Sequence, residues 1–210
     1  MQLYNRLVSD DHVHVIDDFY QDLTWLDSHL KNATFKSITD ANYAGLQSVA
    51  PIMVEETQKR FELILGEKLS FLASDGVIRV QRQMDENQQK TFIHFDLNRI
   101  NALIYLSDPP IKDNPEIYGT HFYQHLGLKK KRFISLNSSK DDFQRKIVYE
   151  DTRQFNAWSR WLTVPFKRNR ALIFDGNLYH STSLHFFGDG PENGRLTQNF
   201  FPKKIEDKKV

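Results

Sequence analysis

The chain has 210 residues, of which 40% are hydrophobic and 13% aromatic, so it can bury the core of a single domain. Its 28 basic and 27 acidic residues give a formal net charge of +1, which supplies no electrostatic basis for binding nucleic acid or a membrane surface. Cysteine is absent, which excludes disulfides, cysteine-ligated zinc and a cysteine nucleophile. No run reaches the roughly 18 apolar residues of a membrane span, and the N-terminus has no apolar leader. We therefore expect one cytoplasmic domain over residues 1–210.

The first third of the chain predicts helices that follow a single strand. Val13–Phe19 alternates apolar and polar residues, which is typical of a strand. Asp22–Leu30 predicts a short helix, and Tyr43–Leu46 lies in a polar stretch that predicts a loop. Ala50–Leu65 gives the strongest helix prediction, because its apolar residues recur at helical spacing and a glycine follows it. Residues 1–70 are therefore expected to be a helical support for the rest of the chain.

From Leu69 onward the pattern is extended rather than helical. We predict strands at Phe71–Leu72, Val77–Arg82, Thr91–Asp96, Ala102–Leu106, Thr120–Tyr123, Leu162–Phe166, Ala171–Phe174, Leu178–Thr182 and Leu196–Phe201. Weaker patterns predict strands at Arg132–Ser135 and Lys146–Tyr149, a short helix at Thr152–Trp161 and a frayed charged tail at Lys203–Val210. Helices followed by about eight short strands favour a mainly β chain with N-terminal helices. Its expected form is a double-stranded β-helix, a cupin-like jelly-roll barrel, with the core at residues 71–201.

Two potential metal ligands lie two positions apart in the predicted strand Thr91–Asp96. On a strand, such residues share a face, so His94 and Asp96 would enter one cavity while Phe95 points the other way. His180 ends a second apolar strand and offers a third ligand. Two histidines and one carboxylate that leave the other positions open are the arrangement of non-heme Fe(II) oxygenases. The alternative is that the histidines are ordinary core or surface residues.

A buried-looking arginine follows the second histidine. Strand geometry places Arg195, Thr197 and Asn199 on one face, and Leu196 on the other. An arginine that points into a barrel needs a partner, because an unpaired buried charge is costly. No acidic residue nearby in the sequence supplies one on that face. A ligand carboxylate, bound through parallel hydrogen bonds, is therefore the expected partner.

The order His94-x-Asp96, His180, Arg195 resembles the signature of the Fe(II)/2-oxoglutarate-dependent dioxygenase superfamily. The flanking segments YLSDP, GTHFY and LIFDGNLYHS resemble its prolyl-hydroxylase-like branch, and the similarity covers about Phe71 to Phe201. The resemblance implies that the two histidines and Asp96 bind Fe(II).

The resemblance also implies a site for the co-substrate. Arg195 would bind the distal carboxylate of 2-oxoglutarate, Thr197 would add a hydroxyl group, and Tyr105 is a further candidate contact. Arg195 follows the second histidine by 195 − 180 = 15 positions, whereas many relatives have about ten. The glycine-rich insert Phe187–Gly194 can loop out and absorb the difference.

The implied activity is hydroxylation of an unactivated C–H bond. Oxidative decarboxylation of 2-oxoglutarate would release succinate and CO2, with ascorbate as a candidate reductant. Asp96 argues against halogenation, because halogenating relatives lack this carboxylate. The expected partners are dioxygen and a small-molecule or peptidyl substrate, with the protein a monomer or a homodimer. The alternative is a non-catalytic, cupin-like module that binds a metal or a small acid.

Other segments carry weaker expectations. His121 and His125 have the spacing of a helical metal pair, but they lie in a predicted strand, so supporting or surface roles are expected instead. Asp108–Gly119 carries three prolines and is too long for a tight hairpin. It is expected to be either a lid over the site, with Gly119 as a hinge, or a surface excursion.

Overall fold

The protein is mainly β, with few helices and antiparallel sheets. The structure is a computed structural model that describes residues 6–10, 13–39, 42–89, 91–97, 100–135 and 139–205. The helices are α1 (Thr24–Asn32), α2 (Glu55–Leu65) and α3 (Ser139–Glu150), with short 3-10 helices η1 (Gln83–Asp85), η2 (Pro115–Tyr118) and η3 (Phe155–Ala157). The strands are β1 (Arg6–Asp10), β2 (Val13–Ile16), β3 (Phe35–Thr39), β4 (Ala44–Ser48), β5 (Leu69–Ser70), β6 (Val77–Gln81), β7 (Ile100–Tyr105), β8 (Thr120–His125), β9 (Trp158–Val164), β10 (Ala171–Asp175), β11 (His180–Thr182), β12 (Arg195–Phe200) and β13 (Lys203–Lys204).

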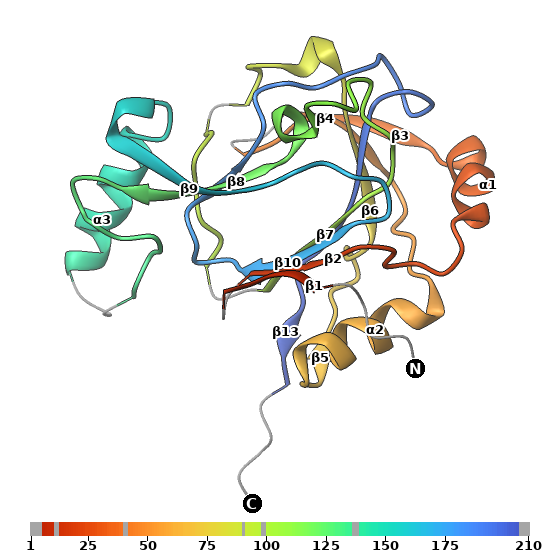
Figure 1. Cartoon of the computed structure of the whole chain (residues 1–210), viewed down its shortest axis with the longest axis horizontal. Coiled ribbons are helices and arrows are strands. Elements are labelled where there is room, and N and C mark those ends of the chain that lie inside the picture. The colour runs from red at the N-terminus through yellow and green to blue at the C-terminus, as the bar shows by residue number, and fades with distance from the viewer. Residues whose placement is uncertain are drawn as a thin grey trace, which may run out of the picture.

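Two antiparallel sheets form the body of the molecule (Figure 1). The large sheet has the strand order β1-β2-β10-β7-β12-β6-β4-β3, and the small sheet has the order β11-β8-β9. A bridge between His94 and His180 adds the segment before β7 to the edge of the small sheet beside β11. A short ribbon of β13 and β5 lies apart from both sheets. Among the described residues, no helix has both the length and the apolar character needed to cross a bilayer.

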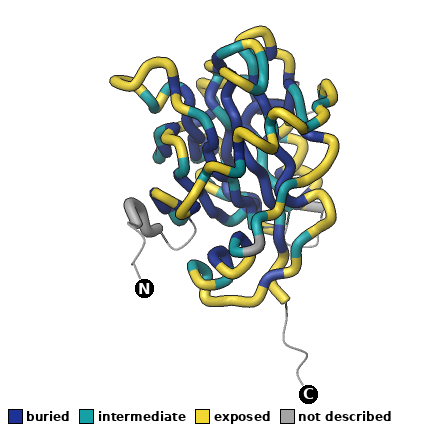
Figure 2. Tube along the Cα trace, turned by 90° about the vertical axis from the view of Figure 1, so that its right-hand side faces the viewer, coloured by how far each residue is buried: buried dark blue, intermediate teal, exposed yellow. Residues whose placement is uncertain are grey.

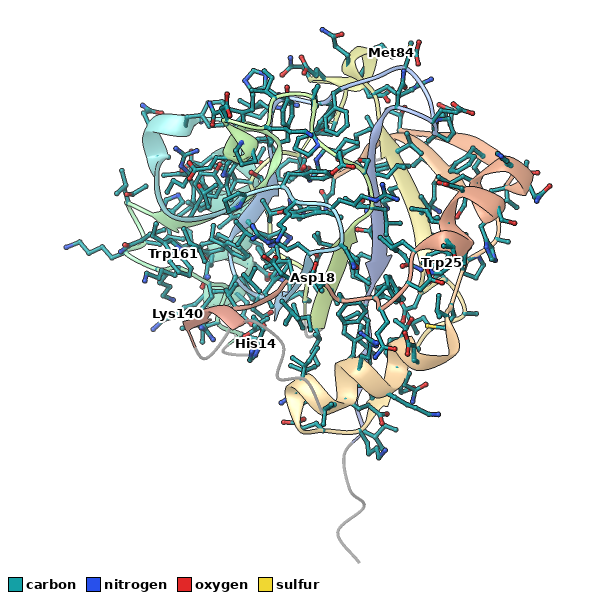
Figure 3. All side chains as sticks on the ribbon, turned by 45° about the vertical axis from the view of Figure 1, so that its right-hand side comes forward. His14, Asp18, Trp25, Met84, Lys140 and Trp161 are labelled. Atoms are coloured by element: carbon teal, nitrogen blue, oxygen red, sulfur yellow. The ribbon has the colours of Figure 1, made fainter. Side chains whose placement is uncertain are left out.

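The sheets are covered by helices on their outer sides and pack on each other inside. One core cluster joins α1 and α2 to the outer face of the large sheet, where Trp25 contacts Tyr20 with ring centroids 5.4 Å apart (Figure 3). A second cluster lies between the sheets, where Leu172 and Phe174 of β10 meet Phe122 of β8. A third places α3 against the small sheet. Figure 2 shows that the buried residues are concentrated in the middle of the molecule.

The N-terminal predictions are only partly right. The loop prediction for Tyr43–Leu46 is wrong, because β4 occupies this stretch and pairs with β3 and β6. Gly45 allows this pairing: it has φ 142°, and a Cβ there would collide with the carbonyl oxygen of Val80. Residues 1–70 are thus more than a helical support, since β1 to β4 belong to the large sheet. The helix predicted at Ala50–Leu65 begins later, at Glu55, but ends at a left-handed glycine as expected.

Three predictions in the second half are also wrong. Lys146–Tyr149 lies in α3, whose residues Asp141, Gln144 and Val148 are buried at helical spacing. Thr152–Trp161 holds only a 3-10 turn before β9, because Trp158 onward pairs with β8. Arg132–Ser135 forms no strand, only an isolated bridge.

The predicted frayed tail is ordered at its start. Lys203 and Lys204 pair with β5 as β13. Residues 206–210 lie outside the described part of the chain.

A buried ion pair between Asp17 and Arg170 connects the end of β2 to the turn before β10. Arg170 donates from Nε to Asp17 Oδ1 at 2.6 Å and from Nη2 to Oδ2 at 3.1 Å. Lys167 donates to the same carboxylate at 2.7 Å. Burial opposes the charge of Asp17, but the hydrogen bonds from Arg170 and Lys167 outweigh it and hold the pKa of Asp17 below its ordinary value.

We predict that Asp17→Ala lowers the free energy of unfolding by about 3–5 kcal/mol, because it leaves the charge of Arg170 buried without its partner. Urea denaturation measures the change. The matched control is Asp108→Ala, whose partner Arg168 lies 3.5 Å away on the exposed surface. That variant should lose less than about 1 kcal/mol. Equal losses in the two variants would contradict this account of the ion pair.

Candidate metal centre

His94 and His180 stand directly opposite each other at the edge of the small sheet. The backbone N–H of His94 donates to the carbonyl of His180 at 3.0 Å, and the reverse bond measures 2.9 Å. Residues that exchange both bonds in this way place their side chains on the same face. The imidazole rings accordingly lie with their centroids 4.5 Å apart.

The segment Thr91–Asp96, predicted as a strand, does not form a regular one. Along it, backbone N–H groups donate in turn to Thr152, His180 and Gly176. Because the partner changes along the segment, no continuous ladder forms, and only an isolated bridge remains. The strand prediction is therefore wrong in this detail.

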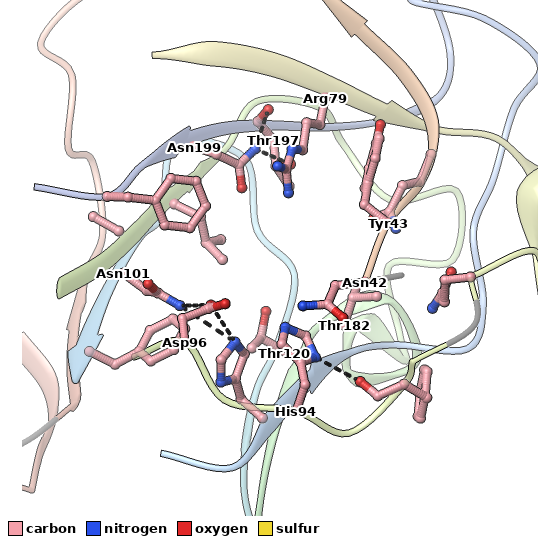
Figure 4. Close-up of a pocket in the computed structure, with 18 of the residues that line it drawn as sticks. Asn42, Tyr43, Arg79, His94, Asp96, Asn101, Thr120, Thr182, Thr197 and Asn199 are labelled. Carbon is pink, nitrogen blue, oxygen red and sulfur yellow. Dashed lines mark hydrogen bonds and ion pairs between the residues drawn. The ribbon is translucent and has the colours of Figure 1, made fainter. Parts of the chain in front are cut away.

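The side chains of this segment nevertheless lie as the sequence predicted. His94 and Asp96 line one cavity, and His180 joins them there (Figure 4). Phe95 points away from it and stacks on Phe133, with ring centroids 4.5 Å apart.

Backbone carbonyls fix both imidazoles in the form that a metal ion requires. Nδ1 of His94 lies 2.9 Å from the carbonyl oxygen of Phe92, and Nδ1 of His180 lies 2.8 Å from that of Leu178. A carbonyl only accepts hydrogen bonds, so each Nδ1 carries the proton and each Nε2 keeps its lone pair. Burial, and then the neighbouring His180, lower the pKa of His94 to about 4, so His94 is neutral at pH 7.

Asp96 is held as a carboxylate beside the two rings. Its Oδ2 accepts a hydrogen bond from Asn101 Nδ2 and lies 3.5 Å from His180 Nε2. Burial opposes ionisation, but the neighbouring His180 and His94 rings and the hydrogen bond from Asn101 hold the pKa of Asp96 well below its ordinary value. Sequence reasoning missed Asn101, whose only signal is its place at the start of the next strand.

The three ligand atoms lie within 4.8 Å of one another, so His94, Asp96 and His180 could hold a metal ion. Metal bonds of about 2.1 Å put neighbouring ligands roughly 3 Å apart, which small side-chain rotations would reach. Two imidazoles and a carboxylate suit divalent first-row ions. The donor set and its hydrogen bonds therefore fit a metal, while its identity as iron stays a prediction.

Arg195 lines the same cavity of about 340 Å³ from β12. It is 2% exposed, and it donates from Nε to the carbonyl of Tyr118 at 2.9 Å and from Nη1 to Gln81 Oε1 at 2.6 Å. Burial lowers the pKa of Arg195 to about 10, so the group remains charged at pH 7. No carboxylate among the described residues forms an ion pair with it. The cavity thus holds a buried positive charge whose hydrogen bonds, within the described part of the chain, go to neutral groups.

The predicted register of β12 is confirmed. Thr197 and Asn199 line the cavity beside the arginine, and Asn199 Nδ2 donates to Thr197 Oγ1 at 3.0 Å. Leu196 and Phe200 point the other way, into the core under the helices. The insert Phe187–Gly194 loops out between β11 and β12, as expected.

Tyr105 does not line the cavity. Its hydroxyl group lies 2.7 Å from Thr120 Oγ1, and its ring lies 5.6 Å from the Arg195 guanidinium carbon. Tyr105 therefore packs beside Arg195, and its position outside the cavity does not favour it as a candidate contact of the co-substrate.

The loop Asp108–Gly119 also stays outside the cavity lining. Its second half is fixed, because Tyr118 is buried against Phe187 and its carbonyl accepts the bond from Arg195. A Cβ at Gly119 would collide with the carbonyl oxygen of Val164, so close packing explains this glycine better than a hinge does. The geometry therefore favours a loop that positions Arg195, rather than a lid over the site.

His121 and His125 are not part of the metal cluster. His121 Nδ1 lies 3.0 Å from Thr163 Oγ1, and His125 Nε2 lies 2.9 Å from Asp151 Oδ2. Both are buried, so the surface alternative for them is wrong. Burial, followed by the charges of nearby arginines, lowers the pKa of His121 to about 4.

The pKa of His121 predicts a pH effect on stability. In the unfolded chain the His121 imidazole binds a proton near its ordinary pKa of about 6.5, whereas in the folded chain it binds one only near pH 4. The free energy of unfolding therefore falls as the pH drops between these values. His121→Gln should remove roughly 2–3 kcal/mol of the stability change between about pH 7 and pH 4. Urea denaturation across that range makes the test, and an unchanged pH dependence would contradict it.

For the metal ligands, we predict that His94→Ala, Asp96→Ala and His180→Ala each weaken Mn(II) or Fe(II) binding by roughly 100-fold or more, whereas Asn101→Ala costs about tenfold. Each of the first three removes a ligand, and the last only releases the Asp96 carboxylate. Calorimetric titration measures the affinities, with circular dichroism as the control for folding. Undiminished affinity in the three ligand variants would exclude this site.

The comparisons with known proteins give the chain a family but no activity. The chain matches no curated protein. One family, described as a family of unknown function (DUF6445), matches residues 2–202, which is nearly the whole chain. On the strength of that match, the chain belongs to the DUF6445 family.

Proposed function

We propose that the protein is an Fe(II)- and 2-oxoglutarate-dependent dioxygenase that hydroxylates an unactivated C–H bond of a small-molecule or peptidyl substrate. One observation carries the proposal: the His94, Asp96 and His180 ligand set and the buried Arg195 face the same cavity. A metal-binding set alone suits many activities. An arginine whose charge no described carboxylate compensates adds the requirement for an anionic ligand beside the metal.

The path of the chain supports a double-stranded β-helix. β6, β7, β10 and β12 are contiguous in the large sheet, and β8, β9 and β11 form the small one. The His94 segment joins the small sheet at the edge of β11. From β6 to β12 the chain changes sheet at every step except the β8–β9 hairpin. This alternation is that of a jelly-roll barrel built from eight extended segments.

The residues of the cavity have separate roles in this proposal. His94, Asp96 and His180 would hold Fe(II), which when bound supplies the activation of dioxygen coupled to decarboxylation of 2-oxoglutarate into succinate and CO2. Arg195 binds the distal carboxylate of 2-oxoglutarate, and Thr197 donates its hydroxyl group to it. Phe174 packs edge-on against His180, with centroids 4.8 Å apart, and keeps water from that side of the site.

Arg195→Ala should weaken binding of N-oxalylglycine, an inert analogue of 2-oxoglutarate, roughly ten- to a hundredfold. The reason is that a charge-assisted hydrogen bond contributes about 1.5–3 kcal/mol. Arg195→Lys should be intermediate, because it keeps the charge but loses the planar fork. Calorimetry on the Mn(II)-loaded protein measures both, and Mn(II) affinity is the control. Equal affinity of wild type and Arg195→Ala would remove the arginine from the co-substrate site.

Turnover tests the activity itself. With Fe(II) and ascorbate, the wild-type protein should convert 2-oxoglutarate to succinate faster in the presence of a suitable acceptor from a panel of candidate substrates, and Asp96→Ala should not. If the protein binds Fe(II) and 2-oxoglutarate but forms no succinate with any acceptor, the non-catalytic cupin-like alternative takes the place of the enzyme.

A further inference from the structure

A second arginine, Arg79, lines the cavity from β6. It stands opposite Thr197 in the register of β6 and β12, so its side chain leaves the large sheet on the same face as Arg195. Figure 4 shows it across the cavity from His94 and Asp96. Arg79 therefore adds a second positive charge to a site in which Arg195 already serves the co-substrate.

The surroundings of Arg79 hold its guanidinium group without neutralising it. The group lies over the ring of Tyr43, 4.6 Å from the centroid, and 5.8 Å from that of Phe201. Its Nε donates to Gln47 Oε1 at 3.4 Å. No carboxylate among the described residues forms an ion pair with it. Stacking on aromatic rings leaves the N–H edge of a guanidinium group free to bind an anion.

Arg79 is the more exposed of the two arginines that line the cavity. Arg195 is buried in the middle of the sheet, whereas Arg79 is half-buried and shares the cavity lining with the exposed Asn42. A ligand that enters after the co-substrate would therefore meet Arg79. The two arginines therefore differ in exposure within one cavity.

Three further polar atoms of the lining lack a hydrogen-bond partner among the described residues. They are the buried side-chain atoms Gln89 Oε1, Asn101 Oδ1 and Thr182 Oγ1. Gln89 is 3% exposed, and burying such an atom unsatisfied is costly. The lining therefore offers hydrogen bonds as well as a positive charge to a polar ligand.

We infer that Arg79 binds a carboxylate of the prime substrate, which is therefore an organic acid that also carries hydrogen-bonding groups, such as an amino or hydroxy acid. This inference rests on the proposed function, because it assigns Arg195 to 2-oxoglutarate and leaves Arg79 for the substrate. A cavity of about 340 Å³ is near the lower end of the range for ligand sites, which fits a small acid beside the co-substrate.

The test compares acids with their uncharged amides on protein loaded with Mn(II) and N-oxalylglycine. The free-acid probes are L-amino acids and 2-hydroxy acids, each compared with the amide of its carboxyl group. The peptidyl probes are C-terminally amidated dipeptides with Asp or Glu, each compared with the same dipeptide carrying Asn or Gln. The two sets distinguish a free acid from a peptidyl one. At least one free acid should bind roughly tenfold or more tightly than its amide. Arg79→Gln should abolish this preference, and Arg79→Lys should reduce it.

Matched controls separate this inference from the proposed function. Arg79→Gln should leave Mn(II) and N-oxalylglycine affinity unchanged, and the exposed Arg168→Gln should leave the acid preference unchanged. If wild type fails to bind N-oxalylglycine, the proposed function fails, and the acid–amide comparison with Mn(II) alone still tests Arg79. The inference is overturned if no free acid is preferred, if the preference survives in Arg79→Gln, or if that variant loses N-oxalylglycine as Arg195→Ala does.

Discussion

The candidate site depends on one pair of reciprocal backbone hydrogen bonds, between His94 and His180. This pair joins residues distant in sequence and turns both imidazoles toward the cavity, with their Nδ1 protons directed at backbone carbonyls. The bond from the Asp96 N–H to Gly176 then brings the carboxylate to the same place. The backbone at the edge of the small sheet thus sets the positions of the three ligands. Their side chains need only small rotations to bind a metal ion.

The interior between the sheets changes from apolar to polar along the large sheet. At β2 and β10 it is filled by residues such as Val15 and Leu172, which pack against the small sheet. At β6 and β12 the inward residues include Arg79, Arg195 and Thr197, and here the cavity opens. Charged and hydroxyl side chains cannot pack as an apolar core without partners, so this half of the interior is suited to a polar ligand. The same strands present apolar residues to the helices on their outer side.

Side-chain directions were predicted best where they follow from the alternation of residues within a single extended segment. The alternation of β12 fixed the inward face of Arg195, and the spacing of His94 and Asp96 placed both in one cavity. Predictions failed where partners distant in sequence decide the structure: β4 exists because Gly45 lets it approach β6, and the His94 segment is irregular because its partners change. Arg79 and Asn101 went unnoticed, since their places in the site follow only from cross-strand register.

The most direct test of the account is a crystal structure of the protein with Mn(II) and N-oxalylglycine. The account predicts Mn(II) bound by Nε2 of His94, Nε2 of His180 and the Asp96 carboxylate, with the distal carboxylate of the analogue on the Arg195 guanidinium group. Mn(II) bound elsewhere, or the analogue bound away from Arg195, would contradict it.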